Sequence, residues 1–144
     1  MKRLIGKTAW VTGGGRGIWR AIALALAADG ANVAISSRTT SELQEVVAEI
    51  EAAGANGLAL QSDAMSLEDT LRCAEQITNE LGSTDILVNN AGFVIYGKVN
   101  ELSSEEIVSQ METNYFGMIY CTKAFLPQML KQHSGHIVNV GKAT

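Results

Sequence analysis

A long hydrophobic run is the first thing that this sequence lacks. No apolar stretch reaches the roughly 18 residues that a membrane-spanning helix needs. The stretch Met1–Lys7 also lacks the apolar core of a signal peptide. Cysteine is scarce: without a secretion signal, Cys73 and Cys121 are expected to be reduced thiols in a cytoplasmic protein. A membrane partner is therefore not expected.

An excess of positive charge is missing as well. The chain has 11 Lys and Arg against 15 Asp and Glu, a net charge of −4, whereas a nucleic-acid partner would require a basic face. The hydrophobic fraction of 47% and the charged fraction of 18% exclude a disordered chain. At 144 residues, one domain with a real core is expected. One proline against 14 glycines suits an architecture with many tight turns.

The sequence does contain a glycine-rich turn, Thr12–Gly17, between a short apolar run and an alanine-rich helical pattern. Glycines let the backbone approach a phosphate closely, and the following helix offers free N–H groups to that anion. A nucleotide pyrophosphate is the first ligand to consider, and the alternative is a tight turn without a ligand. No Gly-Lys-Ser/Thr follows, which excludes a P-loop ATPase. Trp19 stands where such turns usually carry another small residue.

Apolar periodicity alternates along the chain between strand-like and helix-like stretches. Near-continuous apolar strands separated by helices indicate a parallel sheet that is covered on both faces. Right-handed crossovers make this an α/β, Rossmann-type, doubly wound fold with its ligand crevice at the carboxyl ends of the strands. The whole chain, 1–144, reads as one such domain, truncated after about the fifth strand, whose apolar residues predict an association-prone sheet edge. The predicted strands are 8–11, 32–36, 57–61, 86–89 and 136–140.

Capping signatures predict where several helices begin. Ser or Thr followed three residues later by an acidic residue occurs at Thr39, Ser66 and Ser103. The helix after Ser66 is expected to bury one face, and the helix after Ser103 is expected to run to Pro127 with a break near Thr113. The predicted face after Ser66 consists of Leu67, Leu71, Ala74, Ile77 and Leu81.

The end of the second predicted strand bears on cofactor choice. Dinucleotide sites place there the group that reads the ribose, and a carboxylate would favour NAD(H). This sequence has Ser36, Ser37 and Arg38 instead, and Arg38 can pair with a 2′-phosphate. Arg16, inside the glycine turn, is a second cation on the same side. NADP(H) is therefore favoured over NAD(H).

Two further polar groups follow predicted strands. Asp63 either accepts a hydrogen bond from an adenine amino group or caps the turn into the next helix, and the sequence leaves both open. The string 89–92, Asn-Asn-Ala-Gly, suits close backbone approach and hydrogen bonding to a cofactor's ribose or adenine. His133 and His136 have no cysteine or carboxylate neighbours, so no metal site is predicted.

In order along the chain, these motifs resemble the classical short-chain dehydrogenase/reductase family, which includes 3-oxoacyl-carrier-protein reductases and tropinone-reductase-like enzymes. The resemblance also rests on Asn114 within 114–117 and on the strand 136–140, and it covers essentially the whole chain. It implies hydride transfer between a nicotinamide and a small carbonyl or alcohol substrate, with Asn114 holding a water in a proton relay. A helix surface at 103–126 matches a family dimerisation surface, which implies a homo-oligomer. The cofactor-binding residues expected on these grounds are Gly13, Gly15, Arg16, Gly17, Ile18, Ser37, Arg38, Asp63, Asn90, Ala91 and Gly92.

The sequence departs from the family pattern at three places. It contains no Tyr-x-x-x-Lys, Lys142 stands at the family's catalytic serine, and Trp19 replaces the third glycine of the turn. Hydride transfer to a carbonyl needs a proton donor that the protein supplies. Two hypotheses follow: an oxidoreductase whose catalytic C-terminal part lies outside this sequence, or a truncated, non-catalytic homologue that binds nucleotide or acts through protein contacts. The indole of Trp19 is a possible obstruction to the pyrophosphate.

Overall fold

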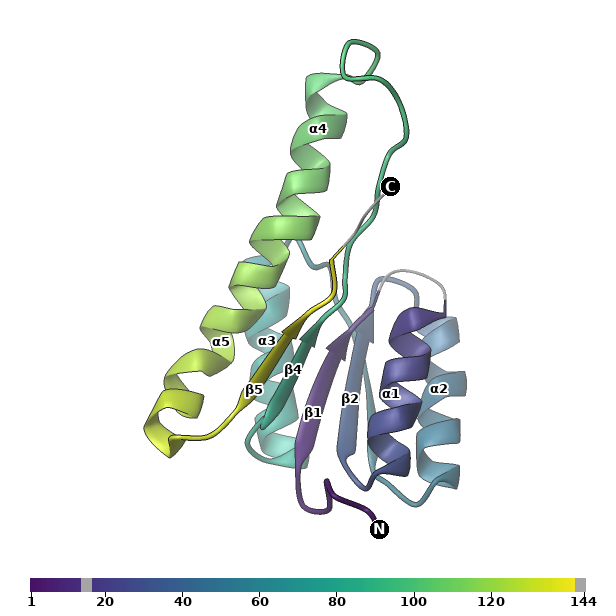
Figure 1. Cartoon of the computed structure of the whole chain (residues 1–144), viewed down its shortest axis with the longest axis vertical. Coiled ribbons are helices and arrows are strands. Elements are labelled where there is room, and N and C mark those ends of the chain that lie inside the picture. The colour runs from purple at the N-terminus through teal and green to yellow at the C-terminus, as the bar shows by residue number, and fades with distance from the viewer. Residues whose placement is uncertain (14–16, 142–144) are drawn as a thin grey trace.

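The computed structural model describes residues 1–13 and 17–141, and it has the α/β architecture that the sequence predicts. Strands and helices alternate along the first four strands, and one long helical segment then leads to the last strand (Figure 1). The strands are β1 (Thr8–Thr12), β2 (Asn32–Ser37), β3 (Gly57–Gln61), β4 (Ile86–Asn89) and β5 (His136–Asn139). The helices are α1 (Ile18–Ala28), α2 (Thr40–Ala52), α3 (Leu67–Leu81), α4 (Ser104–Met111), the π-helical turn η1 (Glu112–Phe116) and α5 (Gly117–Gln132).

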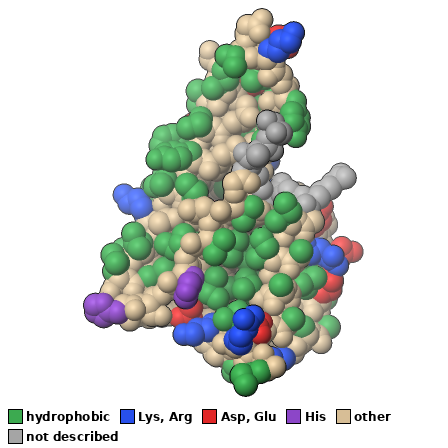
Figure 2. All heavy atoms as spheres, viewed as in Figure 1, with side chains coloured by type: hydrophobic (Ala, Val, Ile, Leu, Met, Phe, Trp, Pro, Cys, Tyr) green, Lys and Arg blue, Asp and Glu red, His purple; other side chains and the backbone are tan. Residues whose placement is uncertain are grey.

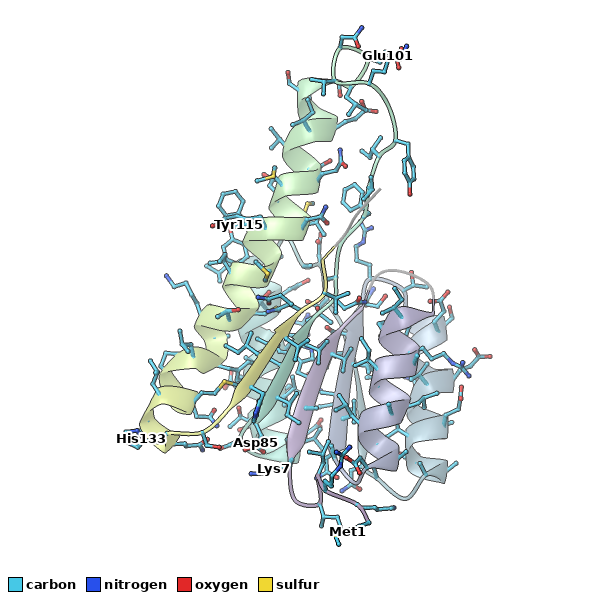
Figure 3. The ribbon with its side chains drawn as sticks, in the orientation of Figure 1. Met1, Lys7, Asp85, Glu101, Tyr115 and His133 are labelled. Atoms are coloured by element: carbon cyan, nitrogen blue, oxygen red, sulfur yellow. The ribbon has the colours of Figure 1, made fainter. Side chains whose placement is uncertain are left out.

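The five strands form one parallel sheet in the order β3-β2-β1-β4-β5. The order reverses direction at β1, which is the arrangement that creates a crevice at the carboxyl ends of the strands. All five residues of β1 are buried because helices cover both faces of the central strand. At the opposite, amino-terminal end, the Asp85 carboxylate accepts a 3.0 Å hydrogen bond from the Thr8 N–H (Figure 3).

Helices cover the sheet in two layers, with α1 and α2 on one face and α3 and α5 on the other (Figure 1). Successive side chains of each strand point to opposite faces of the sheet and pack into two separate cores. Val11 and Ile35 contribute to the core under α1 and α2, whereas Trp10 and Leu60 contribute to the core under α3 and α5. The Trp10 indole packs edge-on against Phe125 of α5, with ring centroids 5.4 Å apart.

Helix α3 buries a face that differs from the predicted one. Leu67 and Leu71 are 47% and 52% exposed, whereas Thr70 is buried. Thr70 can be buried because its hydroxyl donates to the carbonyl of Ser66, 3.0 Å away, and so remains satisfied. The buried stripe is Thr70, Cys73, Ala74 and Ile77.

Two of the three predicted caps form. Ser66 accepts from the N–H of Asp69, and Ser103 and Glu106 form a complete capping box. Thr39 is the N-cap residue of α2, but its side chain makes no capping hydrogen bond. The predicted capping box at Thr39 is therefore wrong, although the predicted helix start is right within one residue.

The helical segment after Ser103 contains the predicted break and extends beyond the predicted end. The break is the π-helical turn η1, which joins α4 to α5 without an interruption of the helical path. Pro127 lies inside α5, and the helix continues to Gln132. Tertiary packing overrides the proline here, because Phe125 and Met129 on either side of it are anchored in the core.

Several apolar side chains remain exposed along α4, η1 and α5, and Figure 2 shows a further group of apolar side chains over β1, β4 and α1. Helix α4 buries none of its residues. Strand β5 pairs with β4 on one side, and Val138 is 48% exposed, so the predicted sheet edge is present in the described chain. None of the described helices is long and apolar enough to cross a membrane.

The caps predict a difference in stability between two matched variants. Ser66→Ala removes a side-chain cap from α3 and should lower the free energy of unfolding by about 1 kcal/mol. Thr39→Ala removes a hydroxyl that caps nothing and should change it by less than about 0.5 kcal/mol. Urea unfolding of both variants checks this, and equal losses would contradict the assignment of the two caps.

Candidate nucleotide-binding cleft

A cleft lies at the carboxyl ends of β1, β2, β3 and β4, where the topology predicts a ligand crevice. The loops after these strands supply most of its walls, and η1 contributes one residue. Its lining is small and polar on the sheet side, which leaves the backbone accessible. The lining residues are Gly13, Ser37, Arg38, Thr39, Ser62, Asp63, Ala64, Ala91, Gly92, Phe93 and Thr113.

Thr12 joins the ends of the two central strands at the floor of the cleft. Its Oγ1 accepts hydrogen bonds from the N–H groups of Asn90 and Ala91, both at 3.0 Å. The same hydroxyl donates to the Val88 carbonyl at 3.3 Å. Thr12 is 5% exposed, so all three bonds lie in a dry environment, where an unmade bond is costly. The Thr12 hydroxyl therefore fixes the position of the segment after β4 relative to the end of β1.

Gly13 lies where two neighbouring groups approach the backbone closely. A Cβ there would lie 3.0 Å from the Trp19 ring and 3.1 Å from the Ser36 carbonyl oxygen. That carbonyl already accepts a 2.7 Å hydrogen bond from the Gly13 N–H. Gly13 is thus held between β2 and the indole, and a Cβ at this position would force its neighbours to shift.

Trp19 is directed into the protein interior. Its side chain is 3% exposed and belongs to the core under α1, together with Ala23 and Ala27 of the same helix. It does not line the cleft that the structure describes. The indole fills the space against Gly13, which explains how the chain accommodates a bulky residue immediately after a glycine turn.

The loop after β2 presents Ser37, Arg38 and Thr39 to the cleft. Ser37 is buried, and its Oγ accepts a 3.1 Å hydrogen bond from the Thr39 N–H, so that the loop folds back on itself. Arg38 is exposed and forms no ion pair with any residue in 1–13 or 17–141. Its carbonyl accepts from Gln61 Nε2 at 3.3 Å.

Asp63 has the turn-forming role that the sequence left open. Its Oδ1 accepts a 3.0 Å hydrogen bond from the Met65 N–H, and its carbonyl accepts from the Ser66 N–H. Asp63 also lines the cleft, as the adenine-binding alternative requires. The two roles are compatible, and only the first is visible in the structure.

The asparagines at the end of β4, Asn89 and Asn90, have different surroundings. Asn89 Nδ2 donates to Asn139 Oδ1 of β5 at 2.9 Å and to Thr122 Oγ1 of α5 at 3.3 Å. Asn90 is 1% exposed and does not line the cleft, whereas Ala91 and Gly92 do. The part of the string that reaches the cleft is therefore its small residues and backbone.

Asn114 clamps the chain that leaves β4. Its Nδ2 donates to the Phe93 carbonyl at 2.8 Å, and its Oδ1 accepts from the Phe93 N–H at 2.9 Å. Four residues earlier, in α4, Gln110 Oε1 accepts from the Ile95 N–H at 3.0 Å. Both ends of the Asn114 amide thus bond Phe93, and its predicted relay role stays a prediction.

Six of the predicted site residues meet at the cleft: Gly13, Ser37, Arg38, Asp63, Ala91 and Gly92. Gly17 has a positive φ of 82° and is the N-cap residue of α1, and Ile18 is 55% exposed, but neither lines the described cleft. Gly15, Arg16 and Lys142 lie outside the described residues. The prediction missed Thr39, Ser62, Ala64, Phe93 and Thr113, of which Ser62 directly follows β3 and was recognisable by that position.

Two electrostatic features flank the cleft. The hydrogen bond from the Asp63 N–H, together with the bond from Arg72, lowers the pKa of Asp69. Burial raises the pKa of Cys121 to about 12 and also raises the pKa of Cys73, so both groups are neutral thiols at neutral pH. No three His, Cys, Asp or Glu side chains of the described segments come together as metal ligands.

Comparison with known proteins places this geometry in context. The model of the family described as short chain dehydrogenase matches residues 7–143. The 3-oxoacyl-[acyl-carrier-protein] reductase of Staphylococcus aureus is 38% identical over 135 residues, which are 93% of this chain and 55% of that protein. The chain thus spans about half the length of the curated relatives it matches.

Solved structures give the same result. A metagenomic short-chain oxidoreductase in complex with NADP superposes with a TM-score of 0.92 at 32% identity, over 98% of this chain and 64% of that one. An NAD+-bound xylitol dehydrogenase superposes with a TM-score of 0.91 at 29% identity, over 96% and 54% of the respective chains. Proteins with this fold therefore include binders of either dinucleotide.

The placement of Trp19 predicts a structural role. Trp19→Ala should lower the free energy of unfolding by about 3 kcal/mol because it leaves a cavity, and Trp19→Phe should cost less. Neither variant should bind NADPH more tightly in a fluorescence titration, since the indole does not line the cleft. Tighter binding by the folded Trp19→Phe variant would show that the indole obstructs the cofactor.

Proposed function

Because the chain belongs to the short-chain dehydrogenase family, we propose that it is the NADP(H)-binding part of an oxidoreductase that acts on a small carbonyl or alcohol substrate. The observation that carries the proposal is the cleft at the carboxyl ends of the strands, with Arg38 and Ser37 at the ribose-reading position. A bound nicotinamide would supply the hydride. The residues of this chain bind and orient that cofactor.

The described cleft fits a dinucleotide in its shape and chemistry. Gly13, Ala64, Ala91 and Gly92 line it without bulky side chains, so a ligand can approach the backbone. At Gly13 the absence of a Cβ leaves the backbone open on the cleft side, as expected of a site where ligand and backbone meet. Asp63 would accept from the adenine amino group with the carboxylate that also orders its own turn.

The charge at the end of β2 favours NADP(H) over NAD(H). The β2 end carries no carboxylate to bond a ribose 2′-hydroxyl and repel a phosphate. Arg38 is exposed and forms no ion pair within the described chain, so its guanidinium is available for bidentate hydrogen bonds to a 2′-phosphate. Ser37 and Thr39 would add hydroxyl contacts beside it.

Asn114 would contribute to proton transfer by holding a water. Each end of its side-chain amide makes one bond to Phe93, which leaves a second N–H and a second oxygen lone pair for that water. The side chain then has a positioning role, since it fixes Phe93 at the cleft wall. The sequence 1–144 holds no Tyr-x-x-x-Lys pair, so the proton donor of the whole enzyme is not among the residues assigned here.

A homo-oligomer formed through the long helix is the second part of the proposal. We define the helical apolar surface as the exposed side chains of Ile107, Val108, Met111, Tyr115 and Phe116, which are 40% to 51% exposed. Tyr115 points away from the body of the protein (Figure 3), and Phe116 stacks with Tyr120 at a centroid distance of 6.4 Å. A contiguous apolar surface of this kind marks a protein interface, and a second copy would cover it.

A cytoplasmic location is the third part. It is supported by Cys73 and Cys121, which are both free and buried as neutral thiols. Such thiols persist in a reducing compartment.

The cofactor assignment predicts a reversal of preference. Arg38→Asp should weaken NADPH binding about tenfold or more and should leave NADH binding within about threefold, because it removes the cation and adds a charge that repels the 2′-phosphate. Arg3→Asp is the control for the charge change, since Arg3 is also exposed but pairs with Asp29 at the other end of the sheet. Calorimetric titration with both nucleotides measures the ratio, and an unchanged ratio in Arg38→Asp would refute the assignment.

The helical apolar surface predicts association of the chain with itself. Met111→Glu should weaken self-association about tenfold or more, because it places a charge in the interface. Leu71→Glu is the control: Leu71 is 52% exposed, against 51% for Met111, but it lies on α3. Sedimentation velocity measures both. A monomeric wild type, or equal effects of the two substitutions, would contradict this surface as the interface.

A further inference from the structure

The turn between β3 and α3 is held in place by a side chain from the helix that follows it. Asp69 Oδ2 accepts a 2.9 Å hydrogen bond from the Asp63 N–H. The N–H of Asp69 in turn donates to Ser66 Oγ, the cap of α3. The carboxylate of Asp69 is therefore the link between the first turn of α3 and the residue that lines the adenine side of the cleft.

Arg72, one turn further along α3, extends this link to β3. Its Nη2 donates to the Gln61 carbonyl at 2.8 Å and to Asp69 Oδ1 at 3.3 Å. Gln61 Nε2 donates to the Arg38 carbonyl at 3.3 Å. A continuous chain of contacts thus runs from Arg72 through Gln61 to the loop that carries Arg38.

The same residues form a groove beside the cleft. Arg38, Ser62 and Asp63 line both the groove and the cleft, so the two hollows are adjacent and share a wall. The outer side of that wall consists of Asp69, Arg72 and Gln61. None of these three lines the cleft itself, so they act on a bound nucleotide only through the wall.

The exposure of the pair indicates what it does. The Arg72 and Asp69 side chains are 51% and 34% exposed, and ion pairs so open to water add little to the stability of the whole fold. Each partner nevertheless bonds the main chain at the cleft wall, Asp69 at Asp63 and Arg72 at Gln61. These two bonds therefore stabilise the local conformation of the cleft wall rather than the whole fold.

We propose that Asp69 and Arg72 are positioning residues for the adenosine end of the cofactor, which they serve by fixing the Asp63 turn and the Arg38 loop at the proper separation. The inference rests on the proposed function, since it names the residues that hold that site in shape. Asp69 orders the adenine-facing carboxylate, and Arg72 acts through Gln61 on the residue that reads the 2′-phosphate.

Hydrogen exchange of the Asp63 amide tests the first contact without any ligand. In Asp69→Ala the Asp63 N–H loses its acceptor, and its exchange should accelerate about tenfold, whereas Asp69→Asn retains an oxygen and should restore most of the protection. The Met65 amide, which bonds Asp63 itself, should change less. An unchanged Asp63 exchange rate in Asp69→Ala would overturn the proposal.

Binding of adenosine 2′,5′-bisphosphate and of 5′-AMP tests the effect on the site. Asp69→Ala should weaken both ligands about tenfold, and Arg72→Gln should weaken the 2′-phosphorylated ligand more than 5′-AMP. Arg20→Gln is the matched control, because Arg20 pairs with Glu49 at a similar exposure of 50% and 40% and lies outside the cleft. Affinities equal to wild type in both α3 variants would overturn the proposal.

The two measurements separate the two claims. A wild-type chain that binds neither nucleotide would sink the proposed cofactor function, and with it the role of Asp69 and Arg72 in cofactor binding. The exchange rate of the Asp63 amide would still decide whether Asp69 orders the turn. Arg72→Lys should recover part of the binding lost in Arg72→Gln, as expected when a donor at that position matters.

Discussion

The hydroxyl of Thr12 is the contact on which the arrangement of the site depends. It binds the backbone N–H groups of two consecutive residues after β4 and the carbonyl of Val88 within β4, all from the last residue of β1. Strand order reverses at these two strands, so their ends must diverge to open a crevice and must still be held at a fixed spacing. A single buried hydroxyl meets both requirements, because it satisfies the N–H groups that the diverging backbone leaves without ladder partners.

The cleft walls are held by similar hydrogen bonds and close contacts in the neighbouring loops. The Gly13 N–H bonds the Ser36 carbonyl, which draws the start of the glycine turn against β2 and would bring an added Cβ within 3.1 Å of that carbonyl oxygen. Trp19 fills the space on the other side of Gly13 and becomes part of the core. On the adenine side, Asp69 and Arg72 hold the wall from behind. Asp69 and Arg72 thus stand one layer behind the strand ends that line the cleft.

Sequence patterns predicted the strands well and the helix faces less well. Near-continuous apolar runs allow only one interpretation for β1 and β4, because both faces of a central parallel strand are covered. Leu67 and Leu71 misled the prediction for α3, since the pattern could not show that Thr70 would bury its hydroxyl by bonding the Ser66 carbonyl. The direction of the Trp19 indole depended on the space left beside Gly13, which no local pattern encodes. Asp69 was recognisable only as part of the Ser66 capping signature, because the partners of Asp69 and Arg72, Asp63 and Gln61, come within reach only in the folded structure.

If the strand-end cleft is the site of a phosphorylated dinucleotide, the backbone amides that contact the nucleotide can be identified directly. Amide chemical shifts recorded during a titration with NADP+ report every backbone position at once. Binding in the cleft should change the amide chemical shifts most at Gly13, Ser37, Arg38, Asp63, Ala91 and Gly92. The shifts at the amino-terminal end of the sheet, around Thr8 and Asp85, should change little. Changes centred on the opposite end of the sheet, or none at saturating nucleotide, would contradict binding in the cleft.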